Sequence, residues 1–208
     1  MNTTEPESRT HWDGVYTQRA LDKVSWYEAT PARSLEWIAA TGVAPEAALI
    51  DVGGGASTLV DELLARGHTD ITVLDVSGEV LSLVAERLGE RRRFVELIAQ
   101  DVTTFRPART YSLWHDRAVF HFMTDEPRRR GYLEALLAGT DPGSHVILST
   151  FGPEGPSRCS GLPTARYDAE GLATVLGRSF RLMRSALEVH TTPGGATQQF
   201  LHTHFIRK

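Results

Sequence analysis

The stretch that decides the fold is Leu49-Ile50-Asp51-Val52-Gly53-Gly54-Gly55-Ala56-Ser57, an apolar strand pattern that runs into three glycines. Glycines let the backbone turn tightly and approach a ligand closely, because no Cβ atom stands in the way. A helical pattern over 58–66 follows at once, so the stretch predicts a strand, a glycine turn and the start of a helix. Alone, it also fits a tight turn that binds nothing.

Outward from this stretch, apolar runs of strand length alternate with helical patterns, which is typical of βαβ units. Strands are predicted at 48–52, 71–75, 94–99, 112–115 and 145–150, and helices at 32–40, 58–66, 78–88, 127–138 and 169–176. Segments 181–190 and 198–207 flank Thr-Thr-Pro-Gly-Gly-Ala, which predicts an antiparallel hairpin. The expected fold is α/β, a Rossmann-like doubly wound domain with a mostly parallel seven-stranded sheet, a C-terminal antiparallel hairpin and helices on both faces.

Composition narrows the class of protein. The 208 residues suit one main domain, expected over 31–208, preceded by an aromatic-rich arm over 1–30. A net charge of −4 does not favour nucleic-acid binding, and the absence of a long apolar run argues against a signal peptide or membrane span. The single cysteine rules out an internal disulfide and a cysteine-rich zinc site. We expect a cytoplasmic protein with no metal site, and its oligomeric state is not readable from the sequence.

Acidic residues follow the second and third predicted strands. Asp75 ends one strand and Asp101 follows the next, where a carboxylate can accept hydrogen bonds from the ribose hydroxyls of an adenosine. Either acid alone could equally cap a helix. An NAD-dependent oxidoreductase is disfavoured, because Thr58 stands where G-x-G-x-x-G has its third glycine and no Tyr-x-x-x-Lys set is present. Asp51 would repel a pyrophosphate but can bind an ammonium group.

These stretches resemble the motifs of class I S-adenosylmethionine (SAM)-dependent methyltransferases over about residues 10–207. The matching stretches are Asp51-Val52-Gly53-Gly54-Gly55, Val73-Leu74-Asp75-Val76-Ser77, Ala99-Gln100-Asp101-Val102, Tyr111-Ser112-Leu113-Trp114-His115-Asp116-Arg117 and Pro142-Gly143-Ser144-His145-Val146-Ile147. Ser57 stands where many members have glycine, and Ser112 where many have aspartate.

The resemblance implies SAM as the cofactor and assigns its contacts along the chain. Asp51, Gly53 and Gly55 would hold the methionine half. Asp75, followed by Val76, would hold the ribose, and Asp101 with Val102 the adenine.

Aromatic side chains are concentrated in the N-terminal arm, which resembles the cover of small-molecule methyltransferases. Aromatic faces attract cations such as a sulfonium, so Trp12 and Tyr16 are expected beside the cofactor, and Trp26 and Tyr27 in the acceptor pocket. Ordinary packing onto the sheet is the alternative.

The fourth predicted strand ends at the edge where ligands bind in open α/β sheets. Asp116, His115 and His121 are therefore the predicted catalytic residues, with Arg117 in the acceptor pocket. The alternatives are a satisfied core histidine for His115, a structural ion pair for Asp116 and packing for His121.

A long segment, 151–163, leaves the fifth strand at the same edge, and loops there commonly carry function. It contains Cys159, which is predicted to line the acceptor pocket. The alternative is an inert, small apolar residue.

The predicted function is methyl transfer from SAM to a small acceptor, with a thiol, selenol or other soft nucleophile preferred because it needs little base catalysis. Two alternatives stay open. Asp116-Arg117 resembles a dipeptide of some protein lysine methyltransferases, and the fold could serve a non-catalytic SAM-binding module. A small-molecule partner is expected, with neither nucleic acid nor membrane.

Overall fold

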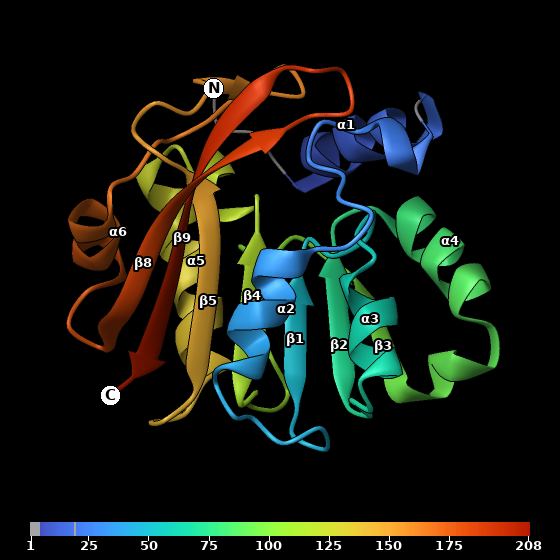
Figure 1. Ribbon diagram of the computed structural model, residues 1–208, viewed down its shortest axis with the longest axis horizontal. Coiled ribbons are helices and arrows are strands. Elements are labelled where there is room, and N and C mark those ends of the chain that lie inside the picture. The colour runs from blue at the N-terminus through green and yellow to red at the C-terminus, as the bar shows by residue number, and fades with distance from the viewer. Residues whose placement is uncertain (1–4, 19) are drawn as a thin grey trace.

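Strand β1 (Leu49–Val52) is buried along its whole length and lies between β2 and β4 in a seven-stranded sheet (Figure 1). This computed structural model describes residues 5–18 and 20–208. The strand order is β3-β2-β1-β4-β5-β9-β8. The remaining strands are β2 (Ile71–Asp75), β3 (Val95–Ala99), β4 (Leu113–Arg117), β5 (His145–Phe151), β8 (Phe180–Thr191) and β9 (Thr197–Arg207).

Strands β1 to β5 run parallel, whereas β9 is antiparallel to both β5 and β8. The predicted Rossmann-like fold with its C-terminal antiparallel hairpin is therefore confirmed. Strand β4 extends two residues beyond its predicted end, so Asp116 and Arg117 lie within the strand. The parallel central strands read as continuous apolar runs because helices cover both of their faces.

Two apolar clusters hold the helices to opposite faces of the sheet. Helices α2 (Ala32–Ala39), α3 (Leu59–Ala65) and α4 (Gly78–Leu88) contribute to one cluster. Helices α5 (Glu126–Ala138) and α6 (Ala169–Leu176) contribute to the other. Helices α4, α5 and α6 each have a side-chain N-cap. The capping residues Ser77, Asp125 and Asp168 each accept a backbone N–H of the first turn.

The arm contains a helix that the sequence analysis did not predict, α1 (Glu5–Gln18), followed by a short 3₁₀ turn, η1 (Leu21–Lys23). Figure 1 shows α1 above the upper edge of the sheet, where β1 and β2 end. Other unpredicted elements are η2 (Gly89–Phe94), η3 (Phe120–Phe122) and a small hairpin of β6 (Arg158–Cys159) and β7 (Leu162–Pro163). The proposed boundary at residue 30 stays a prediction, and residues 1–4 and 19 of the arm lie outside the described residues. None of the described helices is long and apolar enough to cross a membrane.

Candidate active site

The upper edge of the sheet opens into a cavity of about 430 Å³, within the usual range of about 300–1,000 Å³ for ligand sites. Strands, glycine turn, arm and hairpin all contribute predicted site residues to its wall. These are Gly53, Asp75, Val76, Asp101, Val102, Arg117, Trp12, Tyr16, Trp26 and Cys159. The predicted residues that do not line it are Asp51, Gly55, Tyr27, His115, Asp116 and His121.

Each glycine of the turn after β1 is required by what surrounds it. Gly53 has φ +68°, and a Cβ atom there would lie 2.1 Å from Cγ2 of Val119. A Cβ on Gly54 would lie 2.2 Å from Oδ2 of Asp51, and one on Gly55 would lie 2.3 Å from Cγ1 of Val80. Of the three, Gly53 brings bare backbone up to the cavity.

Asp75, at the end of β2, lies beside this turn. Its Oδ2 accepts the Gly55 N–H at 3.2 Å, and its Oδ1 accepts the Ser77 N–H at 2.9 Å. Burial raises the pKa of Asp75 to about 6, although both backbone donors act in the opposite direction. The carboxylate lines the cavity, where the hydroxyls of a ligand would satisfy it further.

Asp101, just beyond β3, is a second carboxylate that lines the cavity. Its Oδ1 accepts the backbone N–H of Thr103 at 2.8 Å and the Thr103 hydroxyl at 2.7 Å. Its Oδ2 accepts from Nη2 of Arg128 at 3.3 Å, and the Arg128 side chain also lines the cavity. Sequence analysis missed Arg128.

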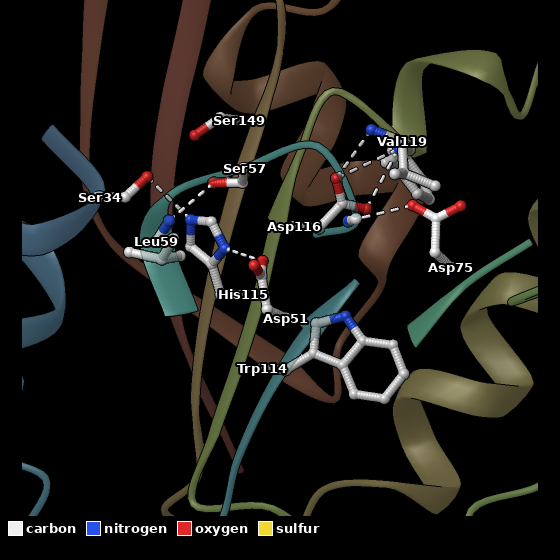
Figure 2. Close-up of polar contacts among 12 residues, drawn as sticks. Ser34, Asp51, Ser57, Leu59, Asp75, Trp114, His115, Asp116, Val119 and Ser149 are labelled. Carbon is white, nitrogen blue, oxygen red and sulfur yellow. Dashed lines mark hydrogen bonds and ion pairs between the residues drawn. The ribbon is translucent and has the colours of Figure 1, made fainter. Parts of the chain in front are cut away.

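Asp51 opens onto a small side pocket of about 20 Å³ that shares Trp26, Gly53 and Arg117 with the main cavity. Tyr27 and His115 also line this side pocket. Figure 2 shows the imidazole of His115 reaching Asp51 at one nitrogen and Ser34 at the other. Oδ2 of Asp51 is buried and has no hydrogen-bond partner among the described residues. His115 therefore lies against the glycine turn rather than beside the main cavity.

Four aromatic rings from three segments meet in the cavity wall. The Trp12 ring lies 5.6 Å from that of Trp26, 5.3 Å from that of Phe122 and 6.2 Å from that of Tyr16. The contacts of Trp12 with Trp26 and Phe122 are edge to face, a favourable geometry for aromatic pairs. Phe122, on η3, was missed because its position after β4 gave no separate signal. We call these residues the aromatic wall.

Residues 24–28, which we call the strap, cross the cavity edge between η1 and α2. Arg117 donates Nη1 to the Trp26 carbonyl at 2.7 Å and Nη2 to Oε1 of Glu28 at 2.6 Å. Nε2 of His190, on β8, lies 2.9 Å from the Ser25 carbonyl oxygen. Arg117 lines the cavity, and its guanidinium is engaged in holding the strap.

Asp116 is fully buried and lies away from the cavity wall. Its Oδ1 accepts the Val119 N–H at 2.9 Å, and its Oδ2 accepts the Phe120 N–H at 3.1 Å and the Tyr132 hydroxyl at 2.6 Å. Burial raises the pKa of Asp116 to about 6. These bonds make Asp116 the anchor of the turn after β4, so a direct catalytic role stays a prediction that this placement does not favour.

His121 is also buried outside the cavity wall, stacked on Phe151 with ring centroids 4.2 Å apart. Neither ring nitrogen has a hydrogen-bond partner among the described residues, and burial lowers the pKa of His121 to about 3. A base with so low a pKa is weak at neutral pH.

Cys159 does line the cavity, with its Sγ 3.9 Å from the Ser25 hydroxyl. Burial raises the pKa of this thiol, which favours the protonated, unreactive form. Its place in the acceptor pocket stays a prediction, and the protonated thiol acts as a small apolar residue of the wall.

The strand order is that of a Rossmann-like fold, with a glycine turn after β1, an acid at the end of β2 and another just beyond β3. No protein-family model matches the chain. One relative is malonyl-[acyl-carrier protein] O-methyltransferase 1 of Ilyobacter polytropus, 30% identical over 105 residues that cover 50% of this chain and 38% of the relative. Another is EEF1A lysine methyltransferase 2 of Danio rerio, 22% identical over 158 residues that cover 69% of this chain and 68% of the relative.

Solved structures share the whole fold. A SAM-dependent methyltransferase from Anabaena variabilis superposes with a TM-score of 0.75 at 15% identity, covering 100% of this chain and 96% of that one. The expected resemblance to class I SAM-dependent methyltransferases is thus confirmed. The chain spans less than half the length of its relative from Ilyobacter polytropus.

Proposed function

We propose that this protein transfers the methyl group of SAM to a small acceptor. The observation that carries the proposal is one cavity whose lining combines Gly53, Asp75 and Asp101 with the aromatic wall. Methyltransferases among its relatives support the reaction class.

The residues present fit SAM. The glycine turn, where added Cβ atoms would meet neighbouring side chains, leads to Asp75, and one buried carboxylate oxygen of Asp51 has no partner among the described residues. Asp51 would receive the ammonium, Asp75 the ribose hydroxyls, and Asp101 with Val102 the adenine. When bound, SAM supplies a methyl group on a sulfonium, and Trp12, Tyr16 and Trp26 would face that cation.

The chain's part in the reaction is to position the acceptor and exclude water. The described part of the cavity wall contains no histidine, and its carboxylates, Asp75, Asp101 and Asp125, each accept a backbone N–H. An acceptor that needs no proton removed by the protein suits such a wall. We therefore favour a thiolate, selenolate or other soft nucleophile, for which the aromatic wall provides dispersion contacts.

A transfer assay with methyl-labelled SAM tests the proposal. Thiols, selenide and tellurite are compared with cell-lysate proteins as acceptors, and small products are separated by extraction. We expect extractable label that falls at least tenfold in Trp26→Ala and is kept in Leu187→Ala, an exposed apolar site on β8. Label found only in a protein band would overturn the small acceptor and favour a protein substrate. No transfer to either class, with SAM still bound, would indicate a binding module.

A further inference from the structure

Ser34, His115 and Asp51 form a buried chain of hydrogen bonds that runs from α2 through β4 to β1 (Figure 2). Nδ1 of His115 lies 2.7 Å from Oδ1 of Asp51, and Nε2 lies 2.9 Å from Oγ of Ser34. The parallel register places Asp51 and His115 directly opposite each other on neighbouring strands. Both ends of the imidazole are therefore fixed.

The chemistry of the partners gives this chain a direction. A carboxylate only accepts hydrogen bonds, so Nδ1 of His115 carries the hydrogen that Asp51 receives. In a neutral ring, Nε2 then accepts from the Ser34 hydroxyl. The Asp51 carboxylate thus sets the ring tautomer, and the Ser34 hydroxyl, which can donate as well as accept, holds the other end of the ring.

The bond to His115 leaves the second oxygen of Asp51 free for another group. Oδ2 is buried and unpartnered among the described residues, and Asp51 lines a side pocket of about 20 Å³. A space of that size holds about one water-sized group. A buried carboxylate oxygen without a partner is costly, so the site favours a cationic hydrogen-bond donor.

We propose that His115 is a positioning residue, backed by Ser34, that holds the Asp51 carboxylate so that Oδ2 receives the ammonium of the cofactor's amino-acid half. This inference rests on the proposed function. His115 acts through Asp51 on cofactor binding and takes no proton from the acceptor, since it does not line the main cavity.

Comparing the binding of two ligands distinguishes the positioning role of His115 from a general structural role. S-adenosylhomocysteine carries the amino-acid half, and 5′-methylthioadenosine lacks it. Calorimetry measures the Kd of each for the wild type, His115→Leu, His115→Asn and Ser34→Ala. The asparagine variant keeps an N–H donor near the position of Nδ1. Ser149→Ala is the matched control, because the Ser149 hydroxyl is buried in the next strand and bonds His202 instead.

We expect His115→Leu to weaken S-adenosylhomocysteine binding by about 10-fold to 100-fold, the usual effect of losing a hydrogen bond to a charged group. Its effect on 5′-methylthioadenosine should stay within about twofold. His115→Asn should recover most of the loss, Ser34→Ala should weaken S-adenosylhomocysteine about threefold to tenfold, and Ser149→Ala should change neither ligand.

Equal weakening of both ligands, or of neither, would overturn the positioning role while leaving the cofactor site in place. If His115→Leu does not fold, the asparagine and Ser34 variants still decide between these outcomes. A wild type that binds both ligands equally would also overturn it, because the amino-acid half would then go unrecognised. Failure of the wild type to bind either ligand would instead overturn the proposed function.

Discussion

The guanidinium of Arg117 on β4 and the carboxylate of Glu28 in the strap meet at 2.6 Å, with side chains only 13% and 22% exposed. A strand of the sheet thereby holds the segment that covers the cavity edge. The pair is sheltered enough that its hydrogen bonds contribute more than those of an exposed ion pair.

Loss of this pair should open the strap. We expect Glu28→Gln to raise the rate of tryptic cleavage after Lys23 by about tenfold, since a charge-assisted hydrogen bond contributes about 1.5–3 kcal/mol and cleavage follows the open population. Glu36→Gln is the control, because Glu36 pairs with Arg33 on the exposed surface of α2. Equal cleavage rates in both variants would contradict a holding role for Arg117.

Asp75 should make cofactor affinity depend on pH. Its pKa is raised to about 6, and ribose hydroxyls donate to the ionised form, so binding drives deprotonation. We expect the Kd for SAM to rise by up to about tenfold per pH unit below pH 6 and to level off above it. Calorimetry at several pH values should show this slope in the wild type and no slope in Asp75→Asn. A wild-type Kd for SAM that does not change with pH would contradict a contact between Asp75 and the ribose.

Asp116 should prove essential for stability rather than for chemistry. We expect Asp116→Asn to lower the free energy of unfolding by about 1.5–3 kcal/mol, because the carboxylate accepts two backbone N–H groups and the Tyr132 hydroxyl. The kcat of the folded variant should change less than about threefold, whereas loss of a general base costs about 100-fold or more. Denaturant unfolding and single-turnover assays on the same preparation distinguish a loss of stability from the loss of a general base.

His121 offers the matching test at the second predicted catalytic position. Its ring nitrogens are unpartnered within the described structure, so His121→Leu should leave stability unchanged or raise it by up to about 2 kcal/mol. Turnover should stay within about threefold. A 100-fold loss in a stably folded variant would restore the role of general base.

The same histidine should shape the response to acid. Its pKa is lowered to about 3 in the folded protein, so its contribution to stability is complete above the unfolded value of 6.5. As the pH falls below 6.5 the unfolded chain takes up the proton first, and stability declines. Asp75 and Asp116, with pKa values raised to about 6, oppose this trend at lower pH. The slope of unfolding free energy between pH 7 and 6 should therefore be shallower in His121→Leu.

The sheet could be predicted from sequence because strand-length apolar runs alternate with helical patterns, and a Pro-Gly-Gly turn separates the last two strands. Helix α1 could not be found that way, because its buried side is short and partly polar. One signal was nevertheless present: Ser8, Trp12 and Tyr16 are each four residues apart and all line the cavity.

The position of a predicted site residue could be anticipated where the backbone alone fixes its place. Gly53, Asp75 and Asp101 follow strands that end at one edge, so strand order predicts their meeting. Whether a side chain at that edge points into the cavity or into the interior is decided by tertiary packing. Asp116 therefore turned out to be bonded to Tyr132 in the interior, and His115 to Asp51 and Ser34.

The central claim is that the glycine turn and its acids form a SAM site, and titration calorimetry of the purified protein with SAM tests it most directly. We predict saturable binding at one site per chain, none with NAD, and loss of SAM binding in Gly53→Val, whose Cβ would meet Val119. Gly67→Val is the control, since Gly67 has a similarly positive φ of +89° but no atom of the described residues within 4 Å of its Cβ position. SAM binding that is absent in the wild type, or unchanged in Gly53→Val, would contradict the account.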